Sequence, residues 1–344
     1  MSVNLALTRC CNQSCLHCYV NAGGARNEGN NELGLEDWIA VVKECRDQGY
    51  EHVHIFGGEP FLVSFLPDLC DAIDDCGMAY NIATNGCLLK PTDYGWLQNT
   101  GGSLVVSVFG GEKFHDAFTG APQSYFRARE TIRTCLARGV NASVATCLMR
   151  RNMEEYSSLI KEFADMGVEE FFVLHFSPIG RGEALFEEAI EPAMWYTFYL
   201  RLKQILPAIR QAVRHEVEIL FELATYPTDN PATLHFTQEV MPCPLPRHLS
   251  LTIDWTGRVF PCILFLNNPS WALGILQHQP LEKILKELTF DWYNQHVKQN
   301  RCPSCRYYGK CQGGCPAYTL GMLRDFRCSD LKYLPFCPIR VIPV

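Results

Sequence analysis

The sequence predicts an α/β fold, a partial (β/α)6 barrel followed by a loop-rich C-terminal domain, and two observations predict it. Apolar, β-rich runs alternate with amphipathic stretches over the first two-thirds of the 344 residues. The last third has closely spaced cysteines and few periodic runs. Because repeated strand–helix units form parallel sheets with right-handed crossovers, we expect a curved or partial barrel. Its chemistry should lie at the carboxyl ends of the strands.

The barrel is expected to contain six strands with helices between them. The strand-like runs are Val3–Leu7, His52–Phe56, Ala79–Ala83, Leu104–Val108, Ala142–Leu148 and Glu170–Leu174. The helix-like runs are Leu35–Gln48, Phe65–Cys76, Asp93–Gln98, Gln123–Arg138, Met153–Met166 and Glu191–His215. Trp38, Val41 and Cys45 recur at helical spacing, which indicates one buried helix face.

The pattern changes after the last of these helices. Residues 1–215 are predicted to form the barrel, 216–242 a linker or bridging region, and 243–344 the C-terminal domain. The stretch Tyr226–Pro246 is rich in proline and polar residues, as linkers and loops are. A hairpin is expected at Ser250–Ile253 and Arg258–Phe260, and a helix at Leu281–Leu288.

Composition excludes several classes of function. The net charge of −7 gives no general basic surface for nucleic acid. No apolar run approaches the ~18 residues of a membrane helix, and the N-terminus shows no signal peptide. The 18 cysteines are tightly spaced, which favours metal ligation over a disulfide scaffold. We therefore expect a cytoplasmic protein that binds neither nucleic acid nor membranes.

Three cysteines follow the first strand in the pattern Cys11-x3-Cys15-x2-Cys18. Three thiolates on one short loop can hold three corners of a cubane iron–sulfur cluster, and the fourth iron stays open to a small molecule. Zinc is the competing interpretation. A closed structural zinc site needs four ligands, and His17 is the nearby candidate for the fourth.

This pattern resembles the signature of the radical S-adenosylmethionine (SAM) superfamily, CxxxCxxC after the first strand of a partial TIM-like barrel. The resemblance implies that Cys11, Cys15 and Cys18 carry the catalytic [4Fe-4S] cluster, whose open iron binds SAM. Tyr19 is the aromatic residue that the family places after the last cysteine.

Further motifs agree with the family in order and position. The SAM-contacting residues that the resemblance implies are Tyr19, Gly57, Gly58, Glu59, Pro60, Asn85, Ser107 and Arg181. The Gly-Gly-Glu-Pro motif ends the second strand, where glycines allow close approach and a carboxylate can pair with the ammonium of SAM. Ser107 would face the ribose, and Arg181 would lie beside the adenine. Phe109 stands where the family often has aspartate, which puts a carboxylate role there in doubt.

A second group of cysteines resembles the SPASM extension of radical SAM enzymes. Its positions are Cys243, Cys262, Cys302, Cys305, Cys311, Cys315, Cys328 and Cys337. The resemblance implies two auxiliary [4Fe-4S] clusters, hence three clusters in all. Cys302, Cys305 and Cys311 would hold the distal cluster, completed by Cys337 or, alternatively, Cys328.

Cys315 would join Cys243 and Cys262 on the proximal auxiliary cluster. This cluster would then have three protein thiolates, and its vacancy could be filled by Cys328, by His235 or His248, by solvent or by substrate. A zinc ribbon is the alternative for the C-terminal group, because four cysteines suffice for zinc.

The resemblance implies an oxidoreductase that cleaves SAM reductively to a 5′-deoxyadenosyl radical. The radical would abstract hydrogen from a peptide or protein, such as a ribosomal precursor peptide. The outcomes in the family include crosslinks, thioethers, epimerisation and splicease-type excision. Ile263 stands where many sulfatase-maturating enzymes have aspartate, which counts against that activity.

Two other classes of function remain open, an enzyme acting on a small molecule such as a haem precursor and a non-catalytic iron–sulfur or zinc protein. The expected partners are an external electron donor such as flavodoxin or ferredoxin and a separate leader-peptide-binding protein. The latter is expected because the first strand begins near residue 3, with no leader-binding domain before it.

Overall fold

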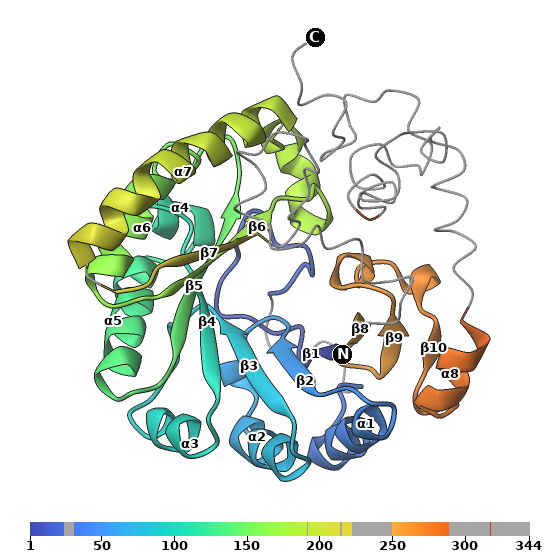
Figure 1. Ribbon diagram of the computed structural model, residues 1–344. Helices are drawn as coiled ribbons and strands as arrows, with labels where there is room; N and C mark the ends of the chain where they lie inside the picture. Colours follow the sequence, from blue (N-terminus) through green and yellow to red (C-terminus); the bar gives the residue numbers. More distant parts are fainter. Residues whose placement is uncertain (24–30, 191, 214, 222–249, 289–316, 318–344) are drawn as a thin grey trace.

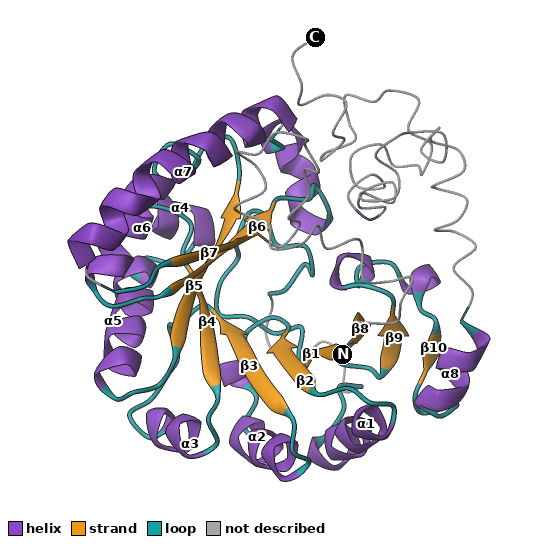
Figure 2. Cartoon of the chain, viewed as in Figure 1, coloured by secondary structure: helices purple, strands orange, loops and turns teal. Residues whose placement is uncertain are grey.

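A computed structural model describes residues 1–23, 31–190, 192–213, 215–221, 250–288 and 317. Its centre is a curved sheet with the helices of the barrel on the outer face (Figures 1 and 2). The strands are β1 Ser2–Ala6, β2 His52–Phe56, β3 Ala79–Thr84, β4 Ser103–Ser107, β5 Ala142–Leu148, β6 Glu170–His175, β7 Glu218–Phe221, β8 Ser250–Ile253, β9 Arg258–Phe260 and β10 Gly274–Ile275. Their order is β10-β9-β8-β1-β2-β3-β4-β5-β6-β7.

Helices connect the strands and cover the convex face. They are α1 Leu35–Asp47, α2 Leu66–Asp75, α3 Asp93–Asn99, α4 Glu112–Thr119, α5 Ser124–Ala137, α6 Tyr156–Asp165, α7 Pro192–Val213 and α8 Leu281–Glu287. Strands β1 to β7 run parallel to their neighbours, as consecutive strand–helix units require. The predicted α/β fold with a parallel sheet is therefore confirmed.

The sheet continues on the far side of β1 into the C-terminal part of the chain. Strand β8 pairs parallel with β1, with Ser2 opposite Ser250 and Leu5 opposite Ile253. The Asn4 amide fastens this junction by donating to Leu251 O at 2.9 Å and Ser250 Oγ at 3.0 Å. Strand β9 pairs antiparallel with β8, which confirms the expected hairpin. The proposed domain boundaries stay predictions.

The two faces of each strand have different roles. On β4, Leu104 and Val106 are fully buried in the core between sheet and helices, whereas Val105 and Ser107 face a cavity inside the barrel. This alternation follows from the two-residue period of a strand. The hydrophobic effect of burying the outward set stabilises the barrel, and the inward set is free to form a site.

Three of these strands and helices were not predicted from the sequence. Strand β7 has four residues and lies in the segment assigned as linker, β10 has two residues, and α4 has eight. All three are too short for a periodic pattern to be distinctive. Among the described helices, none combines the length and the apolar character that a membrane crossing requires.

Candidate active site

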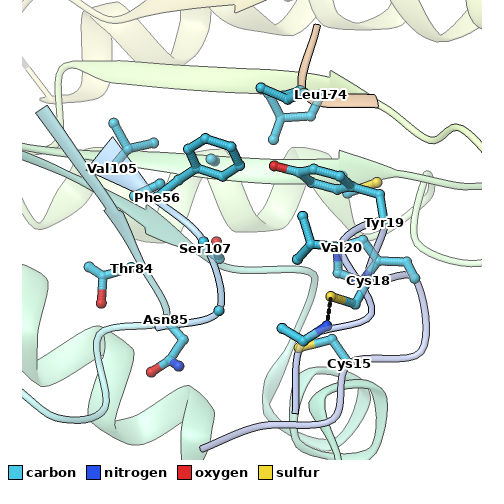
Figure 3. A pocket seen from close by; sticks show the side chains of 18 of the residues that line it. Cys15, Cys18, Tyr19, Val20, Phe56, Thr84, Asn85, Val105, Ser107 and Leu174 are labelled. Atoms are coloured by element: carbon cyan, nitrogen blue, oxygen red, sulfur yellow. Dashed lines mark hydrogen bonds between the residues drawn. The ribbon is translucent and has the colours of Figure 1, made fainter. Parts of the chain in front are cut away.

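A cavity of about 320 Å³ opens at the carboxyl ends of the barrel strands. Its lining combines the cysteine loop after β1 with residues from β2 to β6 and from the segment after β9 (Figure 3). The sequence-predicted residues that it brings together are Cys11, Cys15, Cys18, Tyr19, Gly57, Gly58, Asn85, Ser107 and Arg181. Glu59 and Pro60 are buried beside the cavity and are not part of its lining.

The cysteine loop is fixed along one side by the C-terminal end of α4. The amide of Ser14 donates to Thr119 O at 3.0 Å, and that of Leu16 donates to Phe118 O at 3.1 Å. These bonds satisfy loop donors with helix carbonyls that have no partner within the helix. The helix that the sequence analysis missed therefore helps to hold the loop of the predicted cluster ligands.

Burial and mutual repulsion disfavour the thiolate forms of Cys11 and Cys15 without a metal. Burial raises the pKa of Cys11 to about 11. The pKa of Cys15 is raised further by burial and by the neighbouring Cys11 and Cys18. Bound metal reverses this preference, because a coordinating thiol is deprotonated. A cationic iron centre therefore suits this otherwise unfavourable group of thiols.

The three loop thiols could be ligands of one cluster, because Cys11, Cys15 and Cys18 line the same cavity. Within the described ranges, no three or more His, Cys, Asp or Glu side chains are placed to hold a single metal ion. The ring of His17, the candidate fourth zinc ligand, packs against Phe109 and Phe118, and burial lowers its pKa to about 3.

Two glycines let the end of β2 lie directly against the cysteine loop. Gly58 N donates to Thr8 O at 2.7 Å, and Glu59 N donates to Cys10 O at 2.8 Å. A Cβ at Gly58 would lie 1.9 Å from Cys10 O, and Gly57 has a φ of +141°. Glycine is thus required here for contact with the loop. The approach of these glycines to SAM stays a prediction.

Glu59 lies beneath this turn, where its carboxylate ties β2 to the end of β3. It accepts hydrogen bonds from Thr84 Oγ1 at 2.7 Å, Asn85 N at 2.9 Å and Phe61 N at 3.2 Å. Burial raises the pKa of Glu59 to about 7, although these hydrogen bonds favour the ionised form and lower the pKa. The described bonds hold Glu59 in place, and its pairing with the ammonium of SAM stays a prediction.

The titration of Glu59 should appear in the stability of the protein. Because the folded-state pKa lies above the unfolded value of 4.5, the native state binds the proton more tightly between the two. Stability is then greatest below about pH 4.5 and falls as pH rises through 7, by roughly 3 kcal/mol from this group. Urea unfolding at several pH values should show this slope in the wild type and its loss in Glu59→Gln. Equal slopes would contradict the assignment.

The remaining predicted SAM contacts surround the cavity. Tyr19 stacks towards Phe56 with ring centroids 6.5 Å apart, and Ser107 lies at the end of β4. The Asn85 side chain donates to Asn12 Oδ1 at 2.7 Å and accepts from Cys87 N at 2.9 Å. The cysteine loop and the β3 turn therefore support each other across the cavity.

Arg181 lies against the cysteine loop. Its Nε donates to Cys15 O at 2.9 Å, its Nη1 donates to Ala22 O, and its backbone N donates to Cys18 O at 3.1 Å. The preceding Gly180 allows this approach, because a Cβ there would lie 2.6 Å from Cys18 O. The segment after β6 is thus held against the cysteine loop by the hydrogen bonds of Arg181. Contact of Arg181 with adenine stays a prediction.

Removing the hydrogen bonds of the Arg181 side chain should destabilise the loop that is predicted to hold the cluster. In Arg181→Gln the carbonyls of Cys15 and Ala22 lose charged donors, and we expect a loss of roughly 2 kcal/mol in unfolding free energy. Reconstituted protein should also retain less iron. The control is Arg129→Gln, which removes a half-exposed pair with Glu162. Iron content and stability equal to those of this control would contradict a stabilising role of the Arg181 hydrogen bonds.

The segment after β9 closes one side of the cavity. Ile263 and Leu264 line it, directly after Cys262. Cys262 packs in the same apolar cluster as Cys11 and Cys18. The described member of the second cysteine group therefore lies near the first group. The other predicted auxiliary ligands, Cys243, Cys302, Cys305, Cys311, Cys315, Cys328 and Cys337, lie outside the described residues.

Several lining residues were missed by the sequence analysis. They include Phe56, His54, Asn81, Val105, Phe172, Leu174 and His175. Their positions could have identified them as lining residues, because each belongs to a predicted strand or directly follows one. His54 and Asn81 are also polar residues inside otherwise apolar runs. Motifs mark the strand ends, whereas the interior of a barrel carries no motif of its own.

Sequence models of two protein families match the chain. That of the radical SAM superfamily matches residues 5–163, and that of the SPASM iron–sulfur cluster-binding domain matches residues 243–312. Together they cover more than half of the 344 residues. The chain contains a radical SAM domain and a SPASM domain, as the two cysteine groups predicted. The radical SAM domain indicates an enzyme, and the two domains imply [4Fe-4S] clusters and SAM.

Relatives named for different functions match the chain. The antilisterial bacteriocin subtilosin biosynthesis protein AlbA of Bacillus subtilis is 22% identical over 89% of this chain and 65% of its own length. An AdoMet-dependent heme synthase of Methanosarcina barkeri is 24% identical over 97% of this chain and 95% of its own length. The chain spans 40% to 65% of the length of the first three curated relatives it matches.

The fold has solved counterparts. The structure of Streptococcus suis SuiB bound to precursor peptide SuiA matches 97% of this chain and 74% of its own, with a TM-score of 0.73 and 17% identity. At this identity the likeness shows the fold alone. It confirms the predicted radical SAM partial barrel.

Proposed function

We propose that this protein cleaves SAM reductively to a 5′-deoxyadenosyl radical and uses it to abstract hydrogen from a peptide or protein, such as a ribosomal precursor peptide. The observation that carries the proposal is the convergence of three loop thiols and the SAM-motif residues on one cavity inside the barrel. The bond formed or broken afterwards is a crosslink, a thioether, an epimerised centre or an excision.

Cys11, Cys15 and Cys18 would hold the first [4Fe-4S] cluster, which when bound supplies the electron for SAM cleavage. The chain's own residues do the rest. Gly57 and Gly58 present a backbone edge to the methionine end of SAM. Tyr19 and Phe56 offer ring faces that exclude water from the cavity.

The chemistry of the described walls favours a peptide side chain over a porphyrin. The lining is mostly aromatic and aliphatic, with Phe172, Leu174 and Ile263 among its members. Haem precursors carry carboxylates, and burying these requires paired cations. Arg181 is the cation among the described lining residues, and its Nε and Nη1 already donate to loop carbonyls.

Action on a haem precursor is the second candidate. The observation in its favour is that the AdoMet-dependent heme synthase matches nearly full length, whereas AlbA matches over 65% of its length. Under either candidate we expect three [4Fe-4S] clusters and an external electron donor such as flavodoxin or ferredoxin. Under either candidate we also expect a cytoplasmic location, and for the peptide candidate we add a separate leader-peptide-binding protein.

Deuterium transfer into 5′-deoxyadenosine distinguishes the two candidates. The reconstituted, reduced protein would receive SAM with either short peptides from cells grown in deuterium oxide or deuterated Fe-coproporphyrin III. Deuterium from the peptides supports the proposal, and deuterium from the porphyrin alone supports the second candidate. Unlabelled 5′-deoxyadenosine in both arms contradicts a substrate of either class. Absence of 5′-deoxyadenosine contradicts the SAM chemistry itself.

A further inference from the structure

The cavity extends deeper into the barrel than the predicted SAM contacts. Residues two positions apart on a strand share a face, so each step back along a strand leads one layer further in. On β3 the lining residues are Asn81 and Ala83, and Asn85 follows the strand at the mouth of the cavity. His54 lies one layer below Phe56 on β2. The inner part of the cavity is therefore distinct from the ring of residues at the strand ends.

The walls of this inner part are apolar. Phe56, Val105 and Leu174 contribute side chains around it (Figure 3). Ala83 and Ala145 also belong to the lining, and their small side chains leave room between the strands. Such walls favour an uncharged group, because burial of an isolated charge is costly.

The innermost layer has a polar pair of defined orientation. His54 Nδ1 is hydrogen-bonded to Asn81 Oδ1, and Asn81 Nδ2 lies 3.5 Å from His52 Nε2. His54 and His52 thus lie at opposite ends of the Asn81 side-chain amide. With the Asn81 side-chain oxygen assigned to the side that faces His54, Nδ1 of His54 is assigned the proton, because a carbonyl oxygen only accepts.

The imidazole of His54 consequently offers Nε2 as an acceptor. Burial lowers the pKa of His54, which keeps the ring neutral, although the bond to Asn81 opposes this effect. The ring stacks on Phe56 with centroids 5.8 Å apart, which fixes its plane. His54, the residue that carries this acceptor, lines the inner cavity among the apolar walls.

We propose that the His54–Asn81 pair is a specificity site, at which His54 Nε2 accepts a hydrogen bond from an uncharged donor on the substrate residue. A phenol, an alcohol or an indole fits this site. A carboxylate would bring lone pairs against the lone pair of Nε2, and a hydrocarbon would leave that acceptor unpaired. The inference rests on the proposed function and narrows its substrate class.

Two small probes test the site without the natural substrate. They are p-cresol and 4-methylanisole, each deuterated in the methyl group on the ring. They are similar in shape, but only p-cresol has a donor. The reconstituted, reduced protein would receive SAM and one probe, and deuterium in 5′-deoxyadenosine would be measured. We expect about fivefold more deuterium from p-cresol, as one net hydrogen bond gives.

Two variants test whether His54 causes the preference for p-cresol over 4-methylanisole. His54→Phe keeps an aromatic ring against Phe56 but removes the acceptor, so the yields from the two probes should become equal. His52→Phe is the matched control, because His52 lies beside the same Asn81 and is not part of the lining. It should keep the preference for p-cresol.

The outcomes separate this inference from the proposed function. Equal deuterium from both probes in the wild type, or none from either while 5′-deoxyadenosine still forms, overturns the specificity site. Preference retained in His54→Phe also overturns it. Absence of 5′-deoxyadenosine with every probe overturns the proposed SAM cleavage instead.

Discussion

Replacing Cys15 with alanine is expected to lower the formation of 5′-deoxyadenosine by at least about a thousandfold, because a catalytic unit fails when one essential member is lost. Cys15 lies at the centre of the three-thiol loop and lines the cavity. Its loss leaves two thiols for the first cluster, which cannot hold three iron corners. The measurement is the rate of 5′-deoxyadenosine release from SAM and dithionite by reconstituted protein.

The matched control is Cys10→Ala on the same loop. Cys10 is adjacent to Cys11, but it is not among the residues that line the cavity. This variant should keep the wild-type rate within a few-fold and the wild-type iron content. Substantial 5′-deoxyadenosine from Cys15→Ala, or an equal loss in Cys10→Ala, would contradict the assignment of the loop ligands.

Replacing Gly58 with alanine should have the largest effect on stability. The new Cβ would lie 1.9 Å from Cys10 O and 2.5 Å from Cys10 C, and neither backbone atom can move alone. The cysteine loop must shift, which breaks the bond from Glu59 N to Cys10 O. We expect a loss of more than about 3 kcal/mol in unfolding free energy, together with low iron content.

Gly95→Ala provides the control for this substitution. Gly95 lies in helix α3, and a Cβ there has nothing within 4 Å. Alanine should stabilise this helix by up to about 1 kcal/mol. Chemical denaturation and iron analysis of both variants test the contrast. A Gly58→Ala protein as stable and as rich in iron as Gly95→Ala would be inconsistent with the close approach.

Much of the barrel could be predicted from sequence, because its buried residues recur at the spacing of a strand or a helix. The six expected strands form within one or two residues of their predicted bounds, and the helix expected at Leu35–Gln48 is α1 Leu35–Asp47. Trp38 and Cys45 are fully buried, as their spacing indicated. Short elements such as β7 were missed, because four residues carry too little pattern.

The site could be predicted where motifs mark strand ends, but the direction of a side chain could not. Contact of Glu59 and Arg181 with SAM stays a prediction. In the structure the bonds of Glu59 join β2 to β3, and those of Arg181 hold the cysteine loop. Such bonds depend on neighbours distant in sequence. Likewise, His54 and Asn81 pair across two strands, which no local pattern reveals.

We propose that SAM binds an iron–sulfur cluster held by Cys11, Cys15 and Cys18. Electron paramagnetic resonance of the reduced, reconstituted protein measures this binding. We expect SAM to change the signal of the cluster in the wild type. Cys15→Ala, which should keep the signals of the proposed auxiliary clusters, should show no such change. A wild-type spectrum unaffected by saturating SAM would contradict the binding of SAM to this cluster.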